Sequence, residues 1–167
     1  MRPPPAGAAA RAPLLVDVLR EAGDWAPTAA QIRTWASAAL GRRAAGAELA
    51  VRVVKPAESK RLNARYRGRD SATNVLSFPV PQLPAAAAAA RAAPRALGDL
   101  VICASVVRAE ARQQHKTITA HWAHLVIHGA LHLLGYDHEQ DDEARRMERR
   151  EVAVLKSFGI TNPYRSL

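Results

Sequence analysis

The sequence predicts an α+β (α/β-like) protein in which about five helices pack on a small mixed sheet of four strands. Two observations support this fold class. Four short segments rich in Val, Ile and Leu are bounded by Pro or Gly, as strands are, and segments with helical periodicity lie between them. Strands that alternate with helices form sheets with helices packed on their faces. The 167 residues are close to the length of one domain.

Each expected element has a local signal. The four expected strands are Leu14–Leu19, Glu48–Val54, Asn74–Phe78 and Asp99–Cys103. The first helix is expected to begin after Thr28, a good amino-terminal cap, and to end at Gly41. Pro56 begins a second helix, which Gly68 closes. Three more helices are expected over Ser105–Gln114, Thr117–Leu134 and Glu139–Phe158.

Two segments fall outside this pattern. Residues 1–12 hold prolines and small residues without a hydrophobic stretch, which predicts a disordered tail rather than a secretory signal. Residues 79–97 are rich in Ala and Pro, which predicts a mobile loop, with a transient helix within it as the alternative. Residues 13–167, this loop included, are expected to form a single domain.

Composition limits the classes of function. The chain has 24 Lys and Arg against 15 Asp and Glu, and residues 1–116 carry 18 of the basic and 8 of the acidic residues. A basic surplus of this kind favours a polyanion such as nucleic acid, with solubility as the alternative reading. No apolar stretch approaches the ~18 residues of a membrane helix, so no membrane association is expected. The single cysteine, Cys103, suits a reducing compartment, and we expect a cytoplasmic protein.

The most informative motif is HxxxHxxGxxH, formed by His128, His132, Gly135 and His138. His128 and His132 lie one helical turn apart, so both imidazoles leave from one face. Gly135 supplies a turn that brings back His138 as a third ligand. Three histidines suit one zinc ion per chain, with the fourth position open to water as in catalytic sites. We interpret buried structural histidines as the weaker alternative.

Several residues around this motif each have two readings or an expected surface position. His124 is either a neighbour of the metal ligands or a packed helix residue, and His121 and His115 are expected at the surface. Asp137 either accepts the spare N–H of a ligand imidazole or caps the next helix. Zinc peptidases place a glutamate directly after the first histidine, and Gly129 stands there instead, which argues against a peptidase.

A cationic stretch forms the second constellation. Lys55–Pro79 holds six basic residues within its first fifteen, and Arg67 lies at the expected end of a helix, where a guanidinium can bind a phosphate in bidentate fashion. A solvated helix face is the alternative and suits Lys60 and Arg61. Tyr66 and Phe78 fit base stacking or core packing equally well.

These motifs together resemble the YbeY family of bacterial rRNA-maturation endoribonucleases. The resemblance rests on HGALHLLGYDH, which contains all three histidines, and on five upstream segments in the family's order. These segments are Leu62-Asn63, Tyr66-Arg67-Gly68, Thr73–Pro79, Gly98–Ile102 and His121–His124. It covers about residues 14 to 164. The Pro-rich tail and the Ala-rich loop depart from the family pattern.

The resemblance implies a zinc-dependent endoribonuclease that acts on single-stranded regions of the rRNA precursor, in 16S rRNA 3′-end maturation and ribosome quality control. It implies zinc ligands at His128, His132 and His138 and a functional Arg67 near the cleft. The small ribosomal subunit and its assembly factors are the implied partners, and a monomer is favoured. We expect His132 to act through a metal-activated water and Arg67 to hold the phosphate. Asp137 is the tentative acid or base, with Asp99 as a second candidate.

Two other classes of function compete with this reading. One is a ribosome-associated RNA-binding factor with structural zinc and no turnover, and the other is the zinc peptidase. Attack by water and attack by the RNA 2′-OH are both compatible with the sequence.

Overall fold

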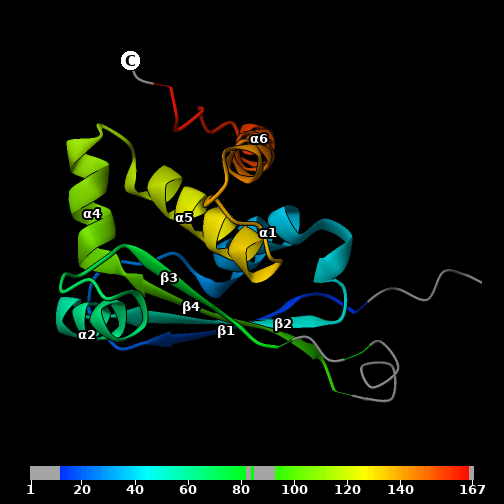
Figure 1. Ribbon diagram of the computed structural model, residues 1–167, viewed down its shortest axis with the longest axis horizontal. Coiled ribbons are helices and arrows are strands. Elements are labelled where there is room, and N and C mark those ends of the chain that lie inside the picture. Colours follow the sequence, from blue (N-terminus) through cyan, green and yellow to red (C-terminus); the bar gives the residue numbers. More distant parts are fainter. Residues whose placement is uncertain (1–11, 82–83, 85–92, 166–167) are drawn as a thin grey trace, which may run out of the picture.

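The computed structural model describes residues 12–81, 84 and 93–165 (Figure 1). The predicted tail therefore lies almost wholly outside the described residues, and so does most of the predicted Ala-rich loop. Ala12, the last residue assigned to the tail, accepts a backbone hydrogen bond from Gly46 (2.9 Å).

The sheet is mixed and has four strands in the described residues, as predicted. The strands are β1 (Leu15–Arg20), β2 (Ala47–Val54), β3 (Val75–Pro79) and β4 (Arg95–Cys103). Their spatial order is β1-β2-β4-β3. β1, β2 and β4 run parallel, and β3 pairs antiparallel with β4.

The described residues form five α-helices and one short 3₁₀ helix. These are α1 (Ala29–Leu40), η1 (Gly41–Ala44), α2 (Pro56–Arg67), α4 (Ala104–Gln113), α5 (Ile118–Leu133) and α6 (Asp141–Ser157). Local signals explain their limits. Thr28 and Gln31 form a capping box at the start of α1, and Thr117 caps α5 through the amide of Ala120 (3.1 Å). Gly68 ends α2 in the left-handed conformation.

Helices cover both faces of the sheet (Figure 1). The main core contains Leu49, Val51 and Leu100 on one face, packed against α1 and α5, and α6 lies outside α5. A smaller cluster on the other face joins Leu62 of α2 to Val101. α5 therefore lies between the sheet and α6, and contacts with both fix the position of its histidines.

β4 begins earlier than predicted, at Arg95 rather than Asp99, and β3 includes Pro79, so the predicted loop is shorter at both ends. Arg95 and Ala96 have little apolar surface, but they become strand because they pair with Ala47 and Glu48 of β2. Leu97 is part of the core. At Gly98 φ is +142°, and a Cβ there would lie 2.2 Å from the carbonyl oxygen of Phe78, so the close approach of β3 requires glycine.

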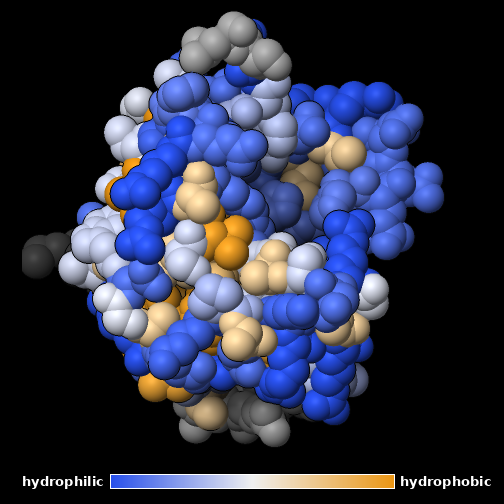
Figure 2. Space-filling model, turned by 90° about the vertical axis from the view of Figure 1, so that its left-hand side faces the viewer, coloured by the Kyte–Doolittle hydropathy of each residue, from blue (hydrophilic) through white to orange (hydrophobic). Residues whose placement is uncertain are grey.

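The end of the molecule that carries α2 and α4 is mostly hydrophilic, with small separate hydrophobic patches (Figure 2). Among the described residues, no helix combines the length and the hydropathy needed to cross a bilayer.

Candidate metal centre and its cleft

The carboxyl-terminal half of α5 brings two predicted ligands together. His128 and His132 are one turn apart, and their Nε2 atoms lie 3.0 Å from each other. Both rings are partly buried, while the apolar residues of α5 pack in the main core. The helical spacing therefore produces the paired imidazoles that the motif predicts.

The turn after α5 adds the third histidine. Gly135 has φ of +90°, and the amide of Tyr136 returns to the carbonyl of Leu131 (3.2 Å), which ends the helix. His138 follows in this turn. One ring nitrogen from each of His128, His132 and His138 lies within 4.8 Å of the others. The structure thus brings together all three histidines that the sequence selected.

Hydrogen bonds fix the tautomers of the two helical histidines. Nδ1 of His128 donates to the carboxylate of Glu151, and Nδ1 of His132 donates to the carbonyl of Tyr136 (2.8 Å). Each ring consequently turns the lone pair of Nε2 towards the other. Two lone pairs that face each other at 3.0 Å repel unless a cation lies between them. Two nitrogens bound to tetrahedral zinc at about 2.0–2.1 Å lie about 3.3 Å apart, so the donor set fits zinc.

The electrostatics favour neutral imidazole at His132. Burial lowers its pKa to about 4, and the neighbouring His128 and His138 act in the same direction. His132 is then unprotonated at neutral pH, as a metal ligand must be.

Glu151 of α6 is a residue of this site that the sequence reasoning missed. Its carboxylate is fully buried and also accepts the hydroxyl of Tyr164. Burial raises the pKa of Glu151, but the nearby His124 and the hydrogen bonds from His128 and Tyr164 lower it more, to about 2. Glu151 is therefore a carboxylate that holds His128 in place. A glutamate 23 residues from His128 carries no local signal of this role.

His124 and Tyr164 complete the surroundings of Glu151. Nε2 of His124 lies 3.4 Å from the hydroxyl of Tyr164 and 3.9 Å from Glu151 Oε2. His124, His128 and Glu151 also offer ligand atoms within 4.8 Å of one another. Because Nδ1 of His128 and Tyr164 both donate to Glu151, we interpret this group as the support of His128 rather than as a second metal site.

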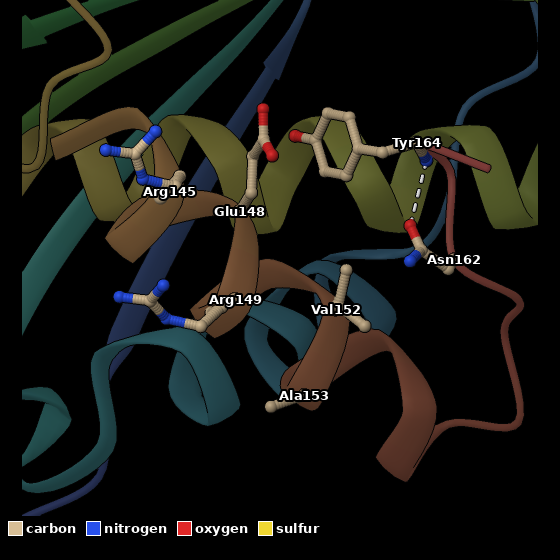
Figure 3. Close-up of a pocket in the computed structure, with 7 residues that line it drawn as sticks. All are labelled: Arg145, Glu148, Arg149, Val152, Ala153, Asn162 and Tyr164. Atoms are coloured by element: carbon tan, nitrogen blue, oxygen red, sulfur yellow. Dashed lines mark hydrogen bonds between the residues drawn. The ribbon is translucent and has the colours of Figure 1, made fainter. Parts of the chain in front are cut away.

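Tyr164 also separates two cavities. On its inner side lies the histidine cavity, of about 280 Å³. On its outer side lies a cavity of about 440 Å³ between α6 and the carboxyl-terminal segment (Figure 3). There Tyr164 lies close to Glu148, and its backbone amide donates to Asn162 (2.9 Å).

Arg67 lines the same cavity as the three histidines. It is the last residue of α2 and is exposed. The chain that follows is anchored, because Asn63 donates to the carbonyl of Ser71 (2.8 Å) and Ser59 to that of Thr73 (2.9 Å). A neighbouring cavity of about 530 Å³ contains Arg67, Arg69, His132 and His138. The predicted phosphate-binding arginine thus lies beside the predicted metal ligands.

The two candidates for the catalytic acid or base, Asp137 and Asp99, lie in different parts of the structure. Asp137 lines the cavity of Arg67 and His138. Its Oδ1 accepts from the backbone amide of His138 (2.7 Å) but is 3.9 Å from the ring, and α6 begins only after Gln140, so neither predicted role of Asp137 is observed. Asp99 lies on the same face of β4 as Val101, opposite to α5. The structure therefore does not bring Asp99 to the cavities of the three histidines.

Gly129 stands where zinc peptidases have a glutamate, and its surroundings are crowded. A Cβ at this position would lie 2.8 Å from Leu100 Cδ2 and 3.2 Å from Ser77 Oγ. Position 129 faces the sheet, so a catalytic glutamate has no room there.

His121 corrects another expectation. It is buried rather than exposed, and its Nε2 lies 2.7 Å from Glu110 of α4. Asn74 also donates to Glu110 (3.0 Å). Burial raises the pKa of Glu110, but the hydrogen bonds from His121 and Asn74 and the neighbouring His124 lower it overall. His115 is exposed, as expected.

The cationic stretch is partly neutralised. Arg61 pairs with Glu58 (2.8 Å) and Lys60 with Asp70 (3.5 Å). The exposed ring of Tyr66 contacts Phe78 edge to face, with centroids 5.1 Å apart. Phe78 packs on the smaller core cluster.

The fold and the site define an α+β protein with three convergent histidines beside an exposed arginine. Residues 21–159 match the family described as Endoribonuclease YbeY. The chain belongs to the YbeY endoribonuclease family, which supports an endoribonuclease role in rRNA processing. The solution structure of TM1509 from Thermotoga maritima is similar, with a TM-score of 0.53 and 21% identity over 91% of this chain and 100% of that chain. At this identity the likeness shows the fold alone.

Proposed function

We propose that this protein is a zinc-dependent endoribonuclease that cleaves single-stranded regions of the rRNA precursor in 16S rRNA 3′-end maturation and ribosome quality control. The observation that carries the proposal is the convergence of His128, His132 and His138 on one point beside Arg67. Family membership supports the RNA substrate.

The three histidines would hold one zinc ion. When bound there, zinc lowers the pKa of a water ligand and polarises a phosphoryl oxygen. Glu151 and the carbonyl of Tyr136 keep the Nε2 atoms of His128 and His132 free for the metal.

Arg67 binds the scissile phosphate. Its guanidinium can offer two parallel N–H donors to phosphate oxygens and neutralise the charge that builds up during cleavage. Asp137, which lines the cavity shared by Arg67 and His138, is the proton donor or acceptor in this proposal. The ends of the RNA products identify the attacking group, because attack by the 2′-OH leaves a cyclic phosphate and attack by water does not.

The proposal extends to the cellular setting. We propose a cytoplasmic monomer that works on the small ribosomal subunit with its assembly factors. Family membership supports this setting through the role in rRNA processing.

A parallel measurement of zinc content and RNA cleavage on wild type and His132→Ala tests the proposal. We expect metal-dependent cleavage by the wild type and the loss of both zinc and cleavage in the variant. Stoichiometric zinc without any cleavage of single-stranded RNA would favour the binding factor with structural zinc instead.

A further inference from the structure

A second cationic cleft lies between α6 and the end of α1. It has a volume of about 580 Å³. Arg42 and Arg43 of η1 line one side, and Arg146 and Arg150 of α6 line the other. We call these four residues the arginine cleft. Arg146 and Arg150 come from the part of the chain whose charges balance in sequence, so only folding reveals the cluster.

The charges of the arginine cleft are largely uncompensated. Arg150 donates to the carbonyls of Ala38 (3.4 Å) and Ala39 (3.3 Å), which fixes it against α1. Within the part of the chain that the structure describes, Arg42, Arg43 and Arg146 form no ion pair, and all three are exposed. Glu143 and Asp137 are the acids that line this cleft. Four arginines and two acidic residues therefore line this cleft.

The arginine cleft adjoins the cavity of Arg67. Gly135, Tyr136 and Asp137 line both. This turn also fixes His132 through the carbonyl of Tyr136 (2.8 Å). The cavity of Arg67 and the arginine cleft therefore meet at this turn.

We propose that the arginine cleft binds backbone phosphates of the single strand on one side of the cleaved bond. The inference rests on the proposed function for the position of the cleaved bond. Planar guanidinium groups match phosphate oxygens in bidentate fashion, and a strand with regularly spaced charges can engage Arg67 and the arginine cleft at once. Each phosphate neutralised releases counterions, so the contribution depends on salt.

The test compares two double variants of equal charge. Arg42→Gln/Arg146→Gln removes one exposed arginine from each side of the arginine cleft. Arg33→Gln/Arg112→Gln is the control, since both arginines are exposed and neither lines the arginine cleft or the histidine cavities. Zinc-loaded protein is titrated against labelled single-stranded DNA of four and of twelve nucleotides at several salt concentrations, and melting temperatures check the fold.

For the cleft variant we expect about tenfold weaker binding of the longer strand and a fall of about 1.4 in the salt slope, for two phosphate contacts. Binding of the short strand should change little, and so should binding of either strand by the control. Equal losses in both variants, or equal losses for both lengths, would overturn the proposal. So would a cleft variant that loses binding of a polyglutamate peptide but not of DNA, because an acidic protein would then be the occupant.

Cleavage kinetics separate this inference from the proposed function. The cleft variant should raise the KM for RNAs extended on one side of the cleaved bond, either 5′ or 3′. The KM for RNAs extended on the other side should stay unchanged. If wild-type protein cleaves RNA but the cleft variant has the wild-type KM for both kinds of extended RNA, the arginine cleft proposal fails and the proposed function stands. If no RNA is cleaved, the proposed function fails and the DNA titration alone decides whether the arginine cleft binds phosphates.

Discussion

His128 offers its two ring nitrogens to different partners. Nε2 faces His132 at 3.0 Å, and Nδ1 donates to the buried Glu151. A carboxylate in this position fixes the tautomer and increases the basicity of Nε2, the nitrogen that we propose binds the metal. Tyr164 donates to the same carboxylate, and burial together with Glu151 raises the pKa of Tyr164, so the phenol stays protonated as a donor.

Glu151→Gln should therefore weaken zinc binding by about 10- to 100-fold, because the amide no longer holds His128 by a charged hydrogen bond. Competition with a chelator measures the affinity. Glu148→Gln is the matched control, since Glu148 lies on the same helix but is exposed and lines the outer cavity. Equal affinities of wild type and Glu151→Gln would remove the supporting role of Glu151.

Arg67→Ala should lower the cleavage rate at saturating RNA by about 100-fold, since one preorganised donor to the phosphate is lost. Zinc content and melting temperature should stay nearly unchanged, because the side chain is exposed. Arg67→Lys should recover part of the rate. Lys60→Ala should reduce the affinity for RNA but leave the cleavage rate at saturating RNA unchanged. If Arg67→Ala behaved like Lys60→Ala, Arg67 would belong to the general cationic surface.

At the scale of elements, polar contacts join α4, α5 and the segment before β3. Glu110 of α4 meets His121 of α5 at 2.7 Å and Asn74 at 3.0 Å. This contact lies beside the histidine cavity, which Asn74 also lines. Because folding lowers the pKa of Glu110, the carboxylate stabilises the folded state above its ordinary pKa of 4.5.

Glu110→Gln should accordingly reduce the free energy of unfolding at pH 7, and the difference from wild type should shrink as the pH falls below about 4.5. Urea unfolding between pH 7 and pH 3 measures this. Glu48→Gln, at an exposed position of β2, should change little. A difference for Glu110→Gln that does not vary with pH would contradict the account.

The close antiparallel pairing of β3 with β4 depends on Gly98. Gly98→Ala should lower the free energy of unfolding by about 3 kcal/mol or more, because φ is +142° and the new Cβ would meet the carbonyl of Phe78 at 2.2 Å. Chemical denaturation measures the loss. Gly23→Ala is the control, since no heavy atom lies within 4 Å of a Cβ there. Equal stabilities of the two variants would mean that the strands adjust freely.

At the scale of the whole molecule, the elements and the histidines were predictable because their signals are local. Cap residues mark α1 and α5, and a one-turn spacing pairs His128 with His132. What sequence reasoning missed depends on packing between distant segments. Glu151 reaches His128 only because α6 packs on α5, and Arg146 joins Arg42 only because α6 lies near the end of α1. His121 was expected at the surface because it is polar, but it is buried and its ring contacts Glu110.

The most direct test of the central claim is a titration of zinc into metal-free protein while the cleavage rate of a single-stranded RNA is followed. If the three histidines hold one catalytic zinc ion, the rate should be negligible without metal, rise as zinc is added, and reach a plateau at one zinc ion per chain. Full cleavage by the metal-free protein, or a plateau that needs two ions per chain, would contradict the assignment of His128, His132 and His138 as the ligands of a single catalytic zinc.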